Sequence, residues 1–93
     1  MNATDVLSMY ENIAGLTNQM VVAARAGDWN DLGKLEGKVA IAADPAEDGL
    51  PALAGSARQR KIDLLKQILA NDRAIRDVTE AWTDPLAKAM QAH

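Results

Sequence analysis

The side chains that could do chemistry in this sequence are mainly carboxylates. The single histidine is His93, and the chain has no cysteine. Acid–base catalysis needs a close pair of titratable groups, and covalent catalysis needs a nucleophile beside a base. The grouped carboxylates coincide instead with expected helix ends and a loop, where such side chains cap helices or bind water. We therefore expect no enzyme, metal or cofactor site from these residues: Asp28, Asp31, Asp44, Glu47 and Asp48.

Asp72 is a second polar feature, because it interrupts the apolar line of the third helical stretch. Arg76 follows it at the four-residue spacing of an ion pair on one helix face, which contributes about 0.3 kcal/mol when exposed. Alternatively, Asp72 is a buried polar group that another helix or a ligand satisfies, fixing the register of the helices. The sequence leaves both interpretations open.

The basic run Arg58-Gln59-Arg60-Lys61 spans just over one helical turn, so its side chains splay around the helix axis. The chain carries 10 Lys and Arg against 13 Asp and Glu, a formal charge of −3. Binding to nucleic acid needs a net or strongly local positive field, so we expect no nucleic-acid partner.

No apolar run approaches ~18 residues, and no basic stretch leads into an apolar core at the N-terminus. We expect a cytoplasmic protein without membrane insertion.

The composition favours helices, because 18 of the 93 residues are alanine, the best helix former, and only three are aromatic. Helices would therefore position the polar residues named above. Apolar residues recur in steps of three and four from Val6 to Ala24, which predicts a helix over about 4–26. Asn2 or Thr4 would cap its start, and Gly27 would end it. Asp28 would then cap a second helix over about 29–43. Within it, Gly33 and Gly37 cost ~1 kcal/mol each but would let another helix backbone approach closely.

Residues 44–55 contain two prolines and two glycines and predict a mobile loop, which Leu50 and Leu53 could pin to the bundle. A third helix is expected over about 56–83, with heptad-like spacing at positions 65, 68, 72, 75, 79 and 82. Asp84–Pro85 would end it and begin a short stub over 85–91. The prediction is one all-α domain over 1–93, an antiparallel three-helix bundle with a short C-terminal helical stub.

Two segments of the chain resemble the flagellar export chaperone FliT family. The first contains Tyr10-Glu11-x-Ile13, then Met20-Val21-x-Ala23-Ala24-Arg25-x-Gly27-Asp28-Trp29-x-x-Leu32, then Leu35-Glu36. The second runs from Arg60-Lys61-Ile62 to Ile68-Leu69-x-Asn71-Asp72-x-x-Ile75-Arg76. Together the two segments cover most of residues 7–76. Short helical patterns recur by chance, but the order and spacing of these two segments make the resemblance more specific than either segment alone.

The resemblance implies a cytosolic helical chaperone that binds and protects the filament-cap protein FliD before type III export. Members of the family also engage the export ATPase complex, and in some bacteria they inhibit the FlhDC regulator of flagellar genes. Longer members carry a fourth helix that folds back and restrains partner binding, whereas only residues 86–91 remain at that place here. The sequence thus leaves open whether this chain is autoinhibited and whether FlhDC is a target.

We expect the FliD segment to lie in a groove between the second and third helices. The polar edge of this groove would consist of Asp72 and Arg76, and its apolar floor of Leu32, Leu35, Val39, Ile68, Leu69 and Ile75. Each apolar residue could equally be ordinary core, which is the stronger interpretation for Leu35 and Ile68. The competing class is a small helical structural or assembly module that acts as a dimer, so a homodimer remains open; concentration-dependent mass would separate the two classes.

Overall fold

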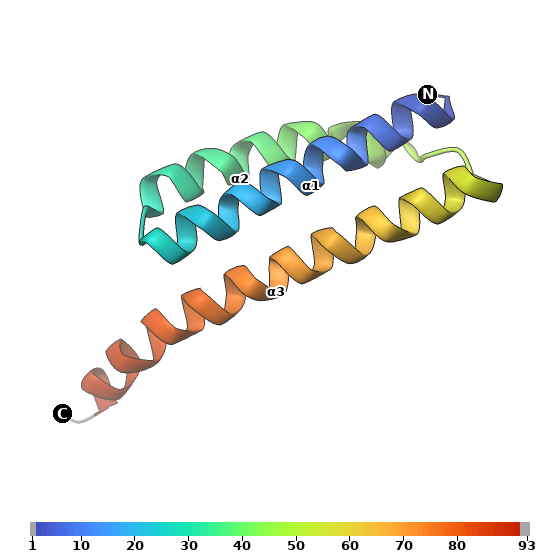
Figure 1. The fold of residues 1–93 in the computed structure, drawn as a ribbon. Helices are drawn as coiled ribbons and strands as arrows, with labels where there is room; N and C mark the ends of the chain where they lie inside the picture. Colours follow the sequence, from blue (N-terminus) through green and yellow to red (C-terminus); the bar gives the residue numbers. More distant parts are fainter. Residues whose placement is uncertain (1, 92–93) are drawn as a thin grey trace.

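Three helices form the molecule in the computed structural model, which describes the backbone of residues 2–91 and the side chains of residues 2–46 and 49–81. They are α1 (Ala3–Ala26), α2 (Trp29–Ala43) and α3 (Gly55–Gln91), and a short 3-10 helix, η1 (Asp44–Asp48), follows α2. α1 and α2 form a hairpin, and α3 runs beside α1 in the same direction (Figure 1). The predicted all-α bundle is confirmed.

The ends of α1 and α2 follow the local chemistry that the sequence predicts. The side chain of Asn2 accepts a hydrogen bond from the Asp5 N–H at 2.9 Å, and the Asp5 carboxylate accepts one from the Asn2 N–H. Gly27 adopts the left-handed conformation with φ 71°, which glycine reaches without a Cβ penalty. The Asp28 carboxylate then accepts from the Asp31 N–H at 3.1 Å and caps α2. These contacts fix a tight α1–α2 turn.

α1 is the central helix of the bundle, because both other helices pack on it. Among the described residues, no Cα of α2 lies within 8 Å of a Cα of α3. At the end near the α1–α2 turn, Leu32 and Leu35 pack against α1, and Ile75 and Val78 of α3 pack against the same cluster. The buried residues of α1 are Val6, Met9, Ile13, Ala14, Thr17, Met20, Val21, Ala23 and Ala24.

The face of α3 that packs on α1 differs from the predicted heptad line. Leu64 is buried to 2% exposure, whereas Leu65 is only half-buried. Asn71 is half-buried and Asp72 is exposed, so the packed face follows positions 61, 64, 68, 71, 75 and 78. The physical reason is the cost of burying charge: an amide can be satisfied by one neutral partner, whereas a carboxylate at the same depth needs a cation. The interpretation of Asp72 as a buried polar group is therefore wrong.

The predicted helix break at Asp84–Pro85 is also wrong, because α3 continues without interruption to Gln91. Proline removes one backbone hydrogen bond from a helix interior. Extending an existing helix avoids the costly nucleation of a separate seven-residue stub, and the residues after Pro85 (Leu-Ala-Lys-Ala-Met-Gln) are strong helix formers. As a result α3 has 37 residues against 24 in α1 and extends past the α1–α2 turn (Figure 1).

The segment between α2 and α3 contains regular secondary structure, whereas the sequence predicted a loop throughout. Its first half forms η1, with Pro45 in the first turn, where a missing N–H costs nothing. Gly49 and Gly55 both have positive φ and turn the chain toward α3. Leu50 and Leu53 are half-buried, in agreement with the expectation that they pin this segment. Its mobility stays a prediction.

Candidate partner-binding surface

The eight residues expected to contact a partner divide by exposure into three sets. Leu32 and Leu35 are core residues, 6% and 3% exposed, so a partner does not reach them in this conformation. The half-buried set is Val39 of α2 with Ile68 and Ile75 of α3. The exposed set, all on α3, is Leu69, Asp72 and Arg76.

The flank of α3 that carries the exposed set can be identified from its contacts with α1. Arg60, Leu64 and Gln67 line a shallow pocket together with residues of α1. At 100° per residue, Leu69 and Arg76 lie on the opposite flank of the helix, away from that pocket. They therefore lie on the side of α3 that faces α2.

The same reasoning orients α2. Lys38, Ile41 and Ala42 line a pocket of about 250 Å³ with Asn12 and Leu16 of α1. The opposite flank of α2, which contains positions 36 and 40, faces the α3 side. The two helix flanks thus border one side of the bundle, which we call the α2–α3 surface: Val39, Ile68, Leu69, Asp72, Ile75 and Arg76.

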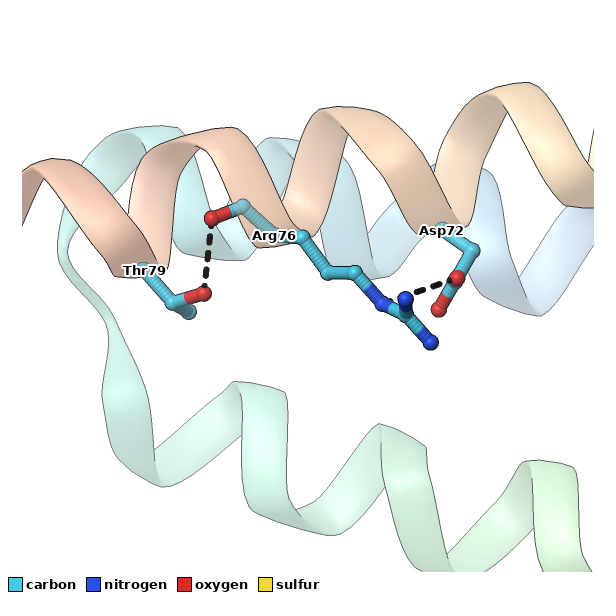
Figure 2. Close-up of polar contacts among 3 residues, drawn as sticks. All are labelled: Asp72, Arg76 and Thr79. Carbon is cyan, nitrogen blue, oxygen red and sulfur yellow. Dashed lines mark hydrogen bonds and ion pairs between the residues drawn. The ribbon is translucent and has the colours of Figure 1, made fainter.

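The polar part of the α2–α3 surface is an exposed ion pair within α3. The Arg76 Nε lies 3.1 Å from the Asp72 Oδ2, and both side chains are more than half exposed. The Thr79 hydroxyl donates to the Arg76 carbonyl at 3.0 Å. Figure 2 shows the three side chains extending from α3 toward the side on which α2 lies. Of the two interpretations of Asp72, the exposed i,i+4 pair is the one that the structure shows.

The buried polar contact between helices falls one residue earlier, at Asn71. Its side-chain amide donates to the Thr17 hydroxyl at 3.1 Å and to the Ala14 carbonyl at 3.4 Å. The Thr17 hydroxyl in turn donates to the Ala14 carbonyl at 3.0 Å. Sequence reasoning missed this pair, although Thr17 stands on the apolar line of α1 and Asn71 lies three residues after Ile68. A polar residue on the apolar side of each helix is the sequence signal that could have identified this pair.

Gly33 and Gly37 do not admit another helix of this chain, contrary to the role that the sequence suggested for them. A Cβ built on either residue meets no described atom within 4 Å.

In the basic run Arg58-Gln59-Arg60-Lys61, Arg60 pairs with Glu11 of α1 at 3.7 Å. That contact is a half-exposed ion pair between α3 and α1.

Two further properties of the described residues bear on function. They contain no group of three or more histidine, cysteine or acidic side chains that could hold a metal ion. No helix in this part of the chain is both long and apolar enough to span a membrane.

Comparison with known proteins supplies the family. A family model described as flagellar protein FliT matches residues 7–93. The crystal structure of flagellar protein FliT from Bordetella bronchiseptica matches with a TM-score of 0.81 and 32% sequence identity, over 90% of this chain and 98% of that chain. The comparison with curated protein sequences gives no match. With the bundle and both characteristic segments in place, this chain belongs to the FliT family of flagellar chaperones.

Proposed function

We propose that this chain binds the filament-cap protein FliD in the cytoplasm and protects it before type III export. Membership of the FliT family supports a role as a flagellar chaperone. The resemblance of the two segments described above supports FliD as the client. Docking of the loaded chaperone on the export ATPase complex is part of the same proposal, and co-sedimentation with the purified ATPase tests it.

The observation that carries the proposal is the unpaired apolar edge of α3 on the α2–α3 surface. Leu69 is 66% exposed, beside half-buried Ile68 and Ile75. Among the described residues, no Cα of α2 lies within 8 Å of a Cα of α3. An amphipathic client helix could bury these side chains while the Asp72–Arg76 pair stays at the hydrated rim. A standard interface of this kind buries about 1,200–2,000 Å² in total.

The direct test is calorimetry of the purified protein against a C-terminal FliD segment from the same organism. We expect binding at micromolar strength or tighter, with a negative heat-capacity change, because apolar surface leaves water. Absence of a heat signal at several temperatures, together with absence of competition, would count against FliD as the client.

A matched pair of variants tests the site separately from the client. Leu69→Ala removes an exposed apolar side chain from the α2–α3 surface and should weaken FliD binding by roughly 5- to 30-fold, the range of a moderate to strong interface residue. Ile41→Ala removes an even more exposed side chain (78% against 66%) from the other flank of α2, where it lines a pocket with α1, and should leave affinity unchanged. Equal effects of the two changes would show that this surface assignment is wrong even if FliD binds.

A further inference from the structure

α2 is the shortest of the three α-helices in the described part of the chain. It has 15 residues, all with described side chains, and only Leu32 and Leu35 among them are buried. Its backbone lies close to α1, whereas no described Cα of α3 lies within 8 Å of it. The α3 side chains Ile75 and Val78 pack against the cluster that contains Leu32 and Leu35. A helix of about 12–15 residues is marginal on its own in water, so α2 stays helical because it is docked on α1.

Two glycines weaken α2 further, and the chain shows no compensating contact for them. Gly33 and Gly37 lie inside the helix, exposed, and neither has the positive φ that would require glycine. A Cβ at either position meets no described atom within 4 Å. Each glycine therefore shifts the equilibrium between helical and open α2 about fivefold toward the open state relative to alanine.

α1 and α3 are linked in ways that do not involve α2. Leu64 of α3 is 2% exposed. The Asn71 amide bonds to Thr17, and Arg60 pairs with Glu11. These contacts fall in the middle of α1, between Glu11 and Asn18, so the α1–α3 pair has its own apolar and polar contacts.

We propose that α2 opens from the bundle as a unit while α1 and α3 remain packed, and that Gly33 and Gly37 set the frequency of opening. Opening uncovers the side of α1 that α2 buries, which includes Met20, Ala23 and Ala24. This apolar side adjoins Ile75, which belongs to the α2–α3 surface. The open state thus offers a wider apolar surface than the closed one. The proposal concerns the free chain and does not depend on the identity of the client.

Hydrogen–deuterium exchange of the free, full-length protein tests this proposal. We expect the amides of α2 to exchange faster than those in the centres of α1 and α3, with a weaker dependence on low concentrations of urea. The double substitution Gly33→Ala and Gly37→Ala should slow exchange in α2 roughly 25-fold, the product of two fivefold effects. Amides in the centres of α1 and α3 that exchange only through global unfolding should slow as well, because global unfolding also opens α2.

Gly15→Ala is the matched control, because Gly15 is also an exposed helical glycine with no described atom within 4 Å of an added Cβ. It lies in α1 and should leave the exchange of α2 unchanged. The proposal is overturned if all three helices exchange at one rate with one urea dependence, or if Gly15→Ala slows exchange in α2 as much as in the centres of α1 and α3. Either result would mean that the bundle opens only as a whole.

Discussion

At the scale of single residues, the Asn71–Thr17 contact explains the register of α3 on α1. Two lines of apolar residues compete on α3, and both include Ile68 and Ile75. The line through Leu64 and Asn71 places an amide against the Thr17 hydroxyl, with no described buried side-chain polar atom left without a partner. The line through Leu65 and Asp72 would bury a carboxylate instead, which costs far more. The polar residues select between two almost equally apolar faces.

Asn71→Ala should therefore destabilise the fold by about 1–2 kcal/mol, because two part-buried hydrogen bonds are lost while Thr17 keeps its bond to the Ala14 carbonyl. Urea denaturation followed by circular dichroism measures this difference. Gln67→Ala, an exposed change on the same helix, is the control and should stay within ~0.5 kcal/mol. An equal, small effect of both substitutions would contradict the role given to Asn71.

At the scale of the elements, the α1–α2 turn depends on the conformation of one residue. Gly27 has φ 71°, and its N–H donates to the Ala24 carbonyl at 3.0 Å. The Asp28 N–H donates to the Ala23 carbonyl at 2.9 Å. Together these bonds satisfy the last carbonyls of α1 and reverse the chain direction within two residues.

Gly27→Ala should cost about 1–2 kcal/mol, because an L-residue is strained in the left-handed region although space for a methyl group is open. Gly15→Ala should have the opposite sign and stabilise the protein by about 0.5–1 kcal/mol, because Gly15 lies in ordinary helical backbone with equal space. Thermal unfolding of the two variants beside the wild type compares them. A stabilising Gly27→Ala would show that the turn is not built as described.

At the scale of the whole molecule, the bundle is elongated and its core is thin. The molecule measures 56 by 23 by 22 Å, with a radius of gyration of 16.3 Å, against ~12 Å for a compact domain of this length. Typical stability for a chain of this size is about 5–14 kcal/mol. Single core side chains therefore account for a large share of the folding free energy.

Leu64→Ala should destabilise the protein by about 2–5 kcal/mol, since Leu64 is one of the two largest fully buried side chains in the described part of the chain. Leu69→Ala removes the same atoms from a 66% exposed position on the same helix and should cost less than ~0.5 kcal/mol. Chemical denaturation of both variants gives the comparison. If Leu69→Ala were the more costly change, the assigned register of α3 would be wrong.

The sequence by itself determined the features that depend on neighbouring residues. Helical periodicity from Val6 to Ala24, the Asn2 and Asp28 caps and the Gly27 stop are local effects, and the structure places each where it was predicted. The two characteristic segments of the FliT family are also local in sequence, so the family could be recognised before the fold was known.

Only the tertiary structure decided the features that depend on distant partners. Leu64 rather than Leu65 is buried because Asn71 meets Thr17, 54 residues earlier in the chain. Asp72 is exposed for the same reason, and Leu32 and Leu35 are core because α2 docks on α1. The continuity of α3 past Pro85 reflects the cost of starting a new helix compared with extending an old one. Pattern along one helix fixes its apolar side to within one residue, and packing against another helix selects the residue.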